Sequence, residues 1–426
     1  EGSAGTPADG RRRTFIVEAA EAVTPSVVSV RVVRRQQARG RGFFDMFFER
    51  DRLTPGLGSG FAIDRRGHVV TNHHVVEGAR RIQVADPSGR VHDAELVGGD
   101  ELTDVALLKI DAGQVSPAPL GTSDDLMVGE PALALGNPFG FHLANAEPTV
   151  TSGVISGIGR DIRSPGQRGV LYADMIQTDA SINPGNSGGA LVNAEGDVVG
   201  VNASILSESG GSVGVGFAIP IDRALRIADE LRRFGAVRQP WVGVDVASAR
   251  SDTLLSRTVV RRVAPGSPAE DAGLREGDVL LAAGGTRLDG PMDWEIALLD
   301  AGVGSEVRVR YARDGEEGTA ALAVEEPPST QAERVEVLRG LELVSVTSGI
   351  AAERDLGVEK GALIVSLDPE VSRATRMREG DVILAVNRRE VADADDAAEL
   401  FRRASGRLQV WLYRDGSTVI TTFGVR

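Results

Sequence analysis

The chain has 426 residues, 42% hydrophobic and 25% charged, which is enough for two or three domains with separate cores. Its formal net charge of -14 argues against nucleic acid as a partner, because binding phosphates needs a basic surface. The absence of cysteine excludes disulfides, thiol catalysis and cysteine-ligated zinc. With 4% aromatic residues and 52 glycines, the composition favours short strands and tight turns, so we expect a mainly β protein.

The N-terminal segment is unlike the rest of the chain. Residues 1–14 are polar and rich in glycine, alanine and arginine, and we predict that they are disordered. They lack the apolar stretch of a signal peptide, so we expect no signal peptide in the chain as given. Residues 15–33 predict a short helix and then a strand, separated at Pro25.

A first domain is expected over residues 15–237. Short apolar or alternating runs, each ended by Gly, Pro, Asp or Asn, recur between residues 58 and 221 and predict a barrel or a sandwich. Residues 222–234 have apolar side chains at helical spacing and predict a helix that closes this region. No run approaches the roughly 20 apolar residues that a membrane span needs, so we expect none.

An internal repeat follows the boundary at residues 238–240. The segment 275–282 (Arg-Glu-Gly-Asp-Val-Leu-Leu-Ala) returns at 378–385 as Arg-Glu-Gly-Asp-Val-Ile-Leu-Ala. Two copies of about 90 residues are typical of duplicated domains and not of a solenoid, which needs more and shorter units. We predict the two domains at residues 240–326 and 335–426, with a proline-containing separator between them.

The sharpest chemical signal is a serine inside a glycine-rich turn. Residues 185–189 read Gly-Asn-Ser-Gly-Gly, with the serine at Ser187. Such a turn can aim consecutive backbone N–H groups at one point, as a tetrahedral oxyanion requires. Alone, this pattern also fits the nucleophile elbow of an α/β-hydrolase or an inert surface loop.

The order of residues along the chain separates these alternatives. An α/β-hydrolase needs a histidine after the nucleophile, but all five histidines precede Ser187. The chymotrypsin order of His, Asp and Ser is available, with His73 and His74 first and Asp104 second. The subtilisin order could use Asp64, but the strand-rich surroundings of Ser187 do not suit its α/β sheet.

Three motifs stand in order along the chain ahead of the two repeats. They are Thr-x-x-His-Val-Val at 71–76, Thr-Asp-Val-Ala-Leu-Leu at 103–108, and Gly-Asn-Ser-Gly-Gly-Ala-Leu at 185–191. Together with the repeats, they resemble the HtrA/Deg family of PDZ-containing serine proteases. The resemblance implies a chymotrypsin-like double β-barrel protease domain followed by two PDZ domains. It also implies His74 as the base, Asp104 as its partner and Ser187 as the nucleophile. An oxyanion hole is expected at Gly185, Asn186 and Ser187.

The same resemblance gives expectations for substrate and control. In a chymotrypsin-like fold the residue six places before the nucleophile lies at the base of the primary pocket, and here it is Ser181, not an acid. With Ile182 and Ile205 also assigned to the pocket, we expect cleavage after small or medium aliphatic residues. Activation is expected to rearrange the loops at residues 144–151, 160–170 and 206–215. No metal or organic cofactor is expected.

Each repeat resembles a PDZ domain, a class that binds a C-terminal peptide as an added strand. The carboxylate-binding loop and first strand are expected at corresponding places in the two copies. A spacer or oligomer contact without a ligand is the alternative for each copy. The expected residues are Trp241, Val242, Gly243 and Val244 in the first copy and Gly340, Leu341, Glu342 and Leu343 in the second.

The leading interpretation is an ATP-independent serine endopeptidase with chaperone activity, which degrades unfolded or damaged proteins in the periplasm or cell envelope. Its expected partners are unfolded proteins, peptide C-termini and copies of itself in trimers or multiples of trimers. The alternative is a chaperone or peptide-binding scaffold in which proteolysis matters little.

Overall fold

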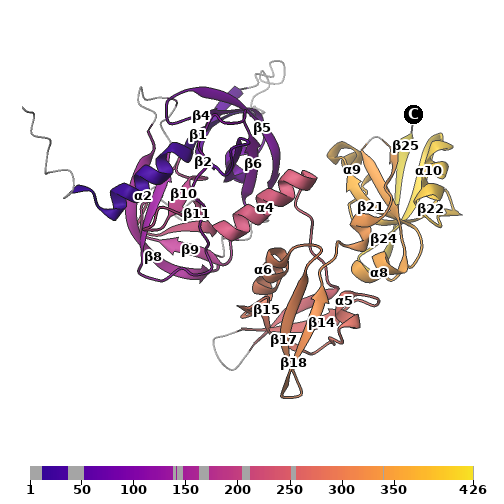
Figure 1. Cartoon of the computed structure of the whole chain (residues 1–426). Helices are drawn as coiled ribbons and strands as arrows, with labels where there is room; N and C mark the ends of the chain where they lie inside the picture. The colour runs from indigo at the N-terminus through magenta and orange to yellow at the C-terminus, as the bar shows by residue number, and fades with distance from the viewer. Residues whose placement is uncertain are drawn as a thin grey trace, which may run out of the picture. The chain divides into compact units, whose positions relative to one another are not determined.

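The computed structural model divides the chain into two units, with the division between Val237 and Arg238. Each unit is described by itself (Figure 1). Of the predicted N-terminal disordered segment, only residues 12–14 fall within the described part of the chain, and Ile205 falls outside it. The structure describes residues 12–36, 52–137, 141, 147–162, 172–203, 212–250, 256–338 and 340–425.

Two closed barrels make up the first unit. Their strand orders are β1-β2-β3-β6-β5-β4 and β10-β11-β12-β9-β8-β7. The first barrel consists of β1 (Val27–Gln36), β2 (Arg52–Ala62), β3 (His68–Asn72), β4 (Ala79–Ala85), β5 (Val91–Asp100) and β6 (Val105–Lys109). The second consists of β7 (Pro131–Gly136), β8 (Thr149–Arg160), β9 (Met175–Thr178), β10 (Ala190–Val192), β11 (Val198–Asn202) and β12 (Gly216–Pro220).

Apolar side chains at alternate positions of a strand fill the core of the first barrel. Along β1, Val28, Val30 and Val32 are fully buried in the first barrel, because side chains two residues apart point to one face of a strand. Around the strands lie α2 (Phe15–Val23), the 3-10 turn η1 (Thr24–Ser26), α3 (His73–Val76) and α4 (Ile221–Phe234). Helix α4 contacts β5 and β6 of the first barrel as well as β11 and β12 of the second, so it braces both.

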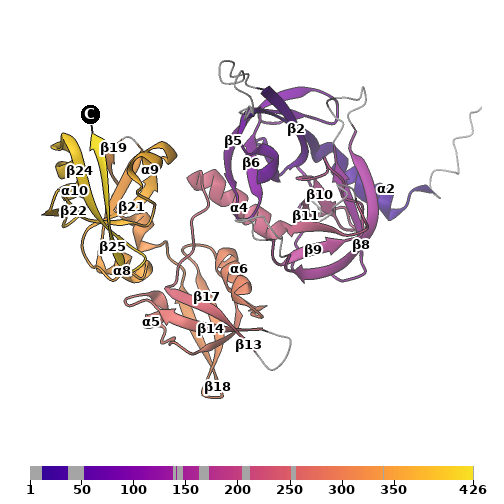
Figure 2. The ribbon, with the colours of Figure 1, turned by 180° about the vertical axis from the view of Figure 1, so that it is seen from behind.

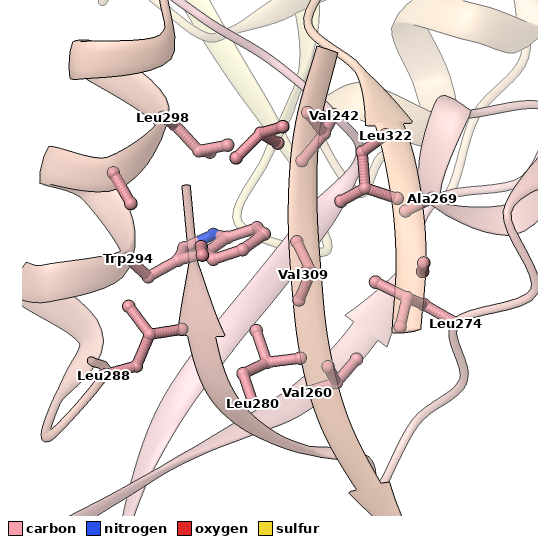
Figure 3. Packing of buried hydrophobic residues seen from close by; sticks show 14 of the residues in the cluster. Val242, Val260, Ala269, Leu274, Leu280, Leu288, Trp294, Leu298, Val309 and Leu322 are labelled. Atoms are coloured by element: carbon pink, nitrogen blue, oxygen red, sulfur yellow. The ribbon is translucent and has the colours of Figure 1, made fainter. Parts of the chain in front are cut away.

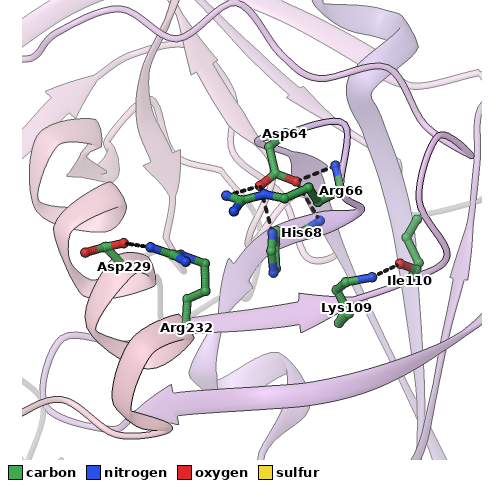
Figure 4. Close-up of polar contacts among 7 residues, drawn as sticks. All are labelled: Asp64, Arg66, His68, Lys109, Ile110, Asp229 and Arg232. Carbon is green, nitrogen blue, oxygen red and sulfur yellow. Dashed lines mark hydrogen bonds and ion pairs between the residues drawn. The ribbon is translucent and has the colours of Figure 1, made fainter.

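Helix α4 also lies close to a polar cluster at the β2–β3 turn (Figure 4). The Asp64 carboxylate accepts hydrogen bonds from the Arg66 side chain at 2.7 Å and from the backbone N–H groups of Arg66 and His68, and its Oδ2 lies 2.8 Å from His68 Nδ1. Burial would raise the pKa of Asp64, but these hydrogen bonds outweigh burial and lower the pKa from 3.8 to about 2. The Asp64 carboxylate is therefore ionised in the folded protein, and its hydrogen bonds stabilise the turn.

We expect Asp64→Asn to lower the free energy of unfolding of the barrel unit by about 1–2 kcal/mol at pH 7. The folded pKa lies below the ordinary value, so this stabilisation is present above pH 3.8 and is lost as the pH falls toward 2. Urea unfolding of wild type and variant at several pH values measures the difference. Asp229→Asn is the control, because its ion pair with Arg232 is solvent-exposed and is expected to contribute less. If wild type and Asp64→Asn differed in unfolding free energy by the same amount at pH 7 and at pH 3, the ionised Asp64 carboxylate would not be the source of the stabilisation.

The second unit contains two sheets, one for each sequence repeat. The first sheet has the order β13-β14-β15-β17-β18, with β16 paired to β15, and the second has the order β19-β20-β21-β22-β24-β25, with β23 paired to β22. Elements of the first repeat are β13 (Val244–Arg250), β14 (Ser256–Val263), α5 (Pro268–Asp271), β15 (Val279–Ala283), β16 (Thr286–Arg287), α6 (Pro291–Ala301), β17 (Glu306–Arg313) and β18 (Glu316–Ala323).

The first repeat has a core of its own. Trp294 of α6 is fully buried and packs with Val309, Leu298 and Leu280 into a single core (Figure 3).

The second repeat begins after a short helix, α7 (Pro328–Gln331). Elements of the second repeat are β19 (Val335–Leu338), β20 (Leu341–Ser345), α8 (Ser348–Glu353), β21 (Ala362–Leu367), α9 (Pro369–Thr375), β22 (Val382–Val386), β23 (Arg389–Glu390), α10 (Ala394–Arg402), β24 (Gly406–Arg414) and β25 (Ser417–Val425).

The repeated segment supplies a buried aspartate to an ion pair in each copy. Arg313 donates two hydrogen bonds of 2.6 and 2.7 Å to Asp278, and Arg414 donates two of 2.6 Å to Asp381. Both aspartates are 1% exposed. Bidentate geometry compensates for the burial of these carboxylates, and the same ion pair forms in both copies.

Candidate active site

His74 and Asp104 lie where two neighbouring strands of the first barrel end. Strands β3 and β6 are antiparallel, with Asn72 opposite Val105. His74 lies in α3, directly after β3, and Asp104 directly precedes β6. The strand register therefore brings the two side chains together.

The buried Asp104 carboxylate holds the imidazole of His74 in one orientation. Its Oδ2 and Oδ1 lie 2.8 and 3.0 Å from His74 Nδ1, and Oδ1 also accepts the backbone N–H of His74 at 2.9 Å. The φ of Asp104 is 57°, a left-handed conformation that aspartate tolerates. Since a carboxylate only accepts hydrogen bonds, the proton on this side of the ring sits on Nδ1, which leaves Nε2 free to act as a base.

Two residues that the sequence analysis did not identify support Asp104. Asn72 donates from Nδ2 to the Asp104 carbonyl at 3.0 Å, and the Tyr172 hydroxyl donates to Asp104 Oδ2 at 3.3 Å. Burial of Tyr172, together with the neighbouring Asp104 charge, raises the pKa of the phenol, so Tyr172 remains a neutral donor. Asn72 could have been noticed from its position beside the histidine pair, but no local pattern singles out Tyr172.

Ser187 comes from the second barrel and lies in a tight turn between β9 and β10. Gly185 and Gly188 have φ values of 99° and 83°, which favour glycine. A Cβ atom on Gly188 would lie 2.3 Å from the carbonyl oxygen of Ser59, so this position also has no room for a side chain. The turn is closed by hydrogen bonds from Asn186 N–H to the Asn183 carbonyl and from Gly189 N–H to the Asn186 carbonyl, both 2.9 Å.

Ser59 on β2 joins this turn to the first barrel. Its backbone N–H donates to the Ser187 carbonyl at 2.9 Å, and its hydroxyl donates to the Gly185 carbonyl at 2.5 Å. The same hydroxyl accepts the backbone N–H of Asn137 at 2.7 Å. Ser59 thus fixes the direction of the Gly185 carbonyl. The sequence analysis missed it, because its role depends on contacts with residues far away in the chain.

Four groups of the site are open to a bound molecule. Within the described part of the chain, the N–H groups of Gly185 and Ser187 donate to no protein acceptor. The Ser187 hydroxyl and His74 Nε2 likewise have no protein partner among the described residues. The His74 side chain is 39% exposed, whereas Ser187 is 8% exposed. The site therefore contains a base, a hydroxyl and two N–H donors that form no hydrogen bond with any described residue.

Two of the three predicted pocket residues lie just before this turn. The Ser181 carbonyl accepts a hydrogen bond of 2.8 Å from the Thr151 hydroxyl. Ile182 is fully buried, and a Cβ atom on Gly216 would lie 2.9 Å from its Cδ1 atom. The third, Ile205, lies outside the described residues, as do parts of the three loops expected to rearrange.

The predicted peptide-binding residues occupy corresponding places in the two repeats. Gly243 and Gly340 both have a φ of 79°, and each lies against the N-cap residue of a helix, Ser267 or Asp368. Val244 begins β13, the edge strand of its sheet. Leu341, Glu342 and Leu343 belong to β20, which has strands on both sides. In the first repeat, Trp241 and the buried Val242 precede the glycine, and Trp241 exchanges backbone hydrogen bonds with Glu325.

Comparisons with known proteins agree with this geometry. Residues 58–201 match the trypsin-like peptidase domain family, and residues 240–324 match the PDZ domain family. The chain is 35% identical over 377 residues to a probable periplasmic serine endoprotease DegP-like from Halomonas elongata, covering 84% of this chain and 77% of the relative. It is also 35% identical to a probable periplasmic serine protease do/HhoA-like from Haemophilus influenzae, covering 84% and 74%.

Solved structures of similar proteins have the same fold. The structure of the HtrA-type protease AlgW with tripeptide is 34% identical, covers 75% of this chain and 99% of its own, and has a TM-score of 0.56. Together with the two barrels and the two sheets, these matches identify a chymotrypsin-like serine peptidase domain followed by two PDZ domains. No helix in the described ranges is long and apolar enough to cross a membrane. The chain belongs to the HtrA/Deg family of PDZ-containing serine proteases.

Proposed function

We propose that Ser187 is the nucleophile of an endopeptidase, with His74 as its general base and Asp104 as the residue that orients that base. The observation that carries this proposal is the 2.8 Å contact between Asp104 Oδ2 and His74 Nδ1. With Nδ1 protonated, Nε2 takes the Ser187 proton as the hydroxyl attacks the substrate carbonyl. His74 then returns the proton to the leaving amine, and water repeats the cycle on the acyl-enzyme. These steps need no metal or organic cofactor.

The oxyanion that forms during attack is assigned to the N–H groups of Gly185 and Ser187. Both are free of protein acceptors among the described residues. The N–H of Asn186 is already used by the Asn183 carbonyl, so Asn186 shapes the turn and does not contact the oxyanion. Donors that are held in place before the charge develops stabilise the transition state without reorganisation.

Substrate preference follows from the pocket residues. Ser181 gives the pocket no negative charge, so a basic side chain has no partner there. Ile182, which the family resemblance assigns to the same pocket, is aliphatic and so favours a small aliphatic side chain such as valine or alanine. Unfolded proteins suit such a site, because they expose aliphatic residues that folded proteins bury.

The biological setting is proposed from the relatives and from the PDZ domains. Several relatives are named probable periplasmic serine proteases, which supports proteolysis in the periplasm. We propose that the chain degrades unfolded proteins there, without ATP. The exposed edge of β13 supports capture of peptide C-termini by the first repeat. We also propose that the protein forms a homotrimer and has chaperone activity.

Casein digestion tests this function, because casein is an unfolded protein. The full chain, without nucleotide, is expected to cut casein into fragments that end mainly in valine, alanine or isoleucine, as read by mass spectrometry. The physical reason is that Ser181 brings no negative charge to the proposed pocket and that Ile182 is aliphatic. Intact casein after prolonged incubation would contradict the endopeptidase assignment, whereas cuts mainly after arginine would overturn only the pocket assignment.

A further inference from the structure

The two repeats differ at the sheet edge where a peptide would bind. In the first repeat, β13 follows the Gly243 turn and is the outermost strand. In the second repeat, β20 is the corresponding strand after Gly340, but β19 lies outside it. Strand β19 is labelled in Figure 2. The chain entering the first repeat takes another course, since Trp241 pairs with Glu325 beyond the end of β18. Among the described residues, the chain itself covers this edge in the second repeat and not in the first.

Strand β19 runs in the direction that a C-terminal peptide would take. It is antiparallel to β20, with Val335 opposite Leu343, Glu336 opposite Glu342 and Leu338 opposite Leu341. A peptide whose carboxylate lies at the loop before β20 would also run antiparallel to β20 and would end at that loop. Leu338, the last residue of β19, therefore occupies the place of the terminal residue of such a peptide.

The side chains of β19 fill apolar space in the second repeat. Val335, Val337 and Leu338 are partly buried and pack against the core that contains Phe401, while Glu336 is exposed. Strand β19 also contacts helix α10, on which Phe401 lies. Backbone pairing combined with alternate side chains packed into a groove is the way in which an added strand is recognised.

Polar contacts also hold β19 against β20 and the loop that precedes β20. Glu336 Oε1 accepts a hydrogen bond of 3.3 Å from the backbone N–H of Gly340, in the loop expected to receive a peptide carboxylate. Arg334 donates a hydrogen bond of 2.8 Å to Glu342 of β20. A side-chain carboxylate of the chain thus already accepts from one N–H group of that loop.

We propose that β19 is an internal ligand of the second repeat, and that this repeat binds hydrophobic C-terminal peptides of the type Val-x-Val-Leu once β19 leaves. The proposal rests on the peptide-binding role proposed above for the PDZ repeats. A segment tethered beside its groove has an effective concentration on the order of millimolar, so micromolar free peptide competes poorly while β19 is in place. The first repeat, with its open β13 edge, has no such competitor among the described residues.

A photo-crosslinking experiment on the full chain tests the proposal. The probe is a benzophenone-labelled peptide ending in Val-Glu-Val-Leu, used with a Ser187→Ala background so that it is not cut. In Val335→Asp/Val337→Asp, crosslinking to residues 340–425 is expected to rise at least tenfold, because the charges release β19 from the groove. The matched control is Glu333→Ala, an exposed position just before β19, which is expected to change nothing. Mass spectrometry separates adducts of the two repeats.

A reversible lock covers the case in which the aspartate variant fails to fold. The natural chain has no cysteine, so Glu336→Cys/Glu342→Cys can form only one internal disulfide, across the β19–β20 pair. At high peptide concentration, the reduced form is expected to crosslink to the peptide in the second repeat, and the oxidised form is not. In the control, both positions are serine, and crosslinking is expected to be the same under reducing and oxidising conditions. Equal crosslinking in both redox states, or none in either, overturns the proposal. Crosslinking of the first repeat shows separately whether a PDZ repeat of this chain binds the peptide. It therefore distinguishes failure of the proposed peptide-binding role from failure of the proposal about β19.

Discussion

Ser187→Ala is expected to lower the turnover of casein on the order of a millionfold, with little change in substrate affinity. Alanine removes the oxygen that forms the acyl-enzyme but leaves the turn intact, since the contacts that hold the turn are made by backbone groups and by Ser59. The residual rate is expected to exceed that of the uncatalysed reaction, because the Gly185 and Ser187 N–H groups remain to stabilise an oxyanion. Initial rates measured with labelled casein give the comparison.

The control for this variant is Ser29→Ala. Ser29 is a fully buried serine of the first barrel whose hydroxyl has no hydrogen-bond partner among the described residues, so its loss removes the same atom without affecting the chemistry. Its turnover is expected to match that of the wild type. If Ser187→Ala digested casein as fast as the control, Ser187 would not be the nucleophile, and the chaperone or scaffold alternative would be preferred.

The parts of the site that the sequence predicts are those whose chemistry restricts the residue type. Only a few side chains can act as nucleophile, base and orienting acid, and their order along the chain is enough to exclude an α/β-hydrolase. In the structure, His74 and Asp104 are in contact, and their catalytic roles stay a prediction. The mainly β fold is also confirmed, because the alternating apolar runs that predict it are a local signal, repeated along many strands.

The supporting residues could not be predicted, because their roles arise from contacts between distant segments. Ser59 lies 126 residues from Gly185, whose carbonyl it holds. Tyr172 reaches Asp104 across 68 residues. The sequence analysis includes residues 335–338 in the second repeat but predicts no strand there, because so short an alternating run is a weak signal. The pairing of β19 with β20 is visible only in the structure.

Asp104→Asn is expected to lower kcat by about ten-thousandfold while KM changes little. Asparagine keeps the size of the side chain and tolerates the left-handed φ of 57° better than alanine does, so the backbone that carries His74 is preserved. The amide, however, cannot stabilise the imidazolium, and its NH₂ group can donate to His74 Nδ1 and so favour the tautomer with Nε2 protonated. In that tautomer His74 cannot accept the Ser187 proton.

A control variant distinguishes loss of the group that orients His74 from a general loss of folded structure. Asp93→Asn is the control, because Asp93 pairs with Arg81 on the surface, where the loss of a charge has little effect. Thermal unfolding of both variants checks that the barrels remain folded, and kcat and KM are measured on one peptide substrate. A drop in kcat of less than about tenfold for Asp104→Asn would show that Asp104 is dispensable for orienting the base. The 2.8 Å contact with His74 Nδ1 would then have only a structural role.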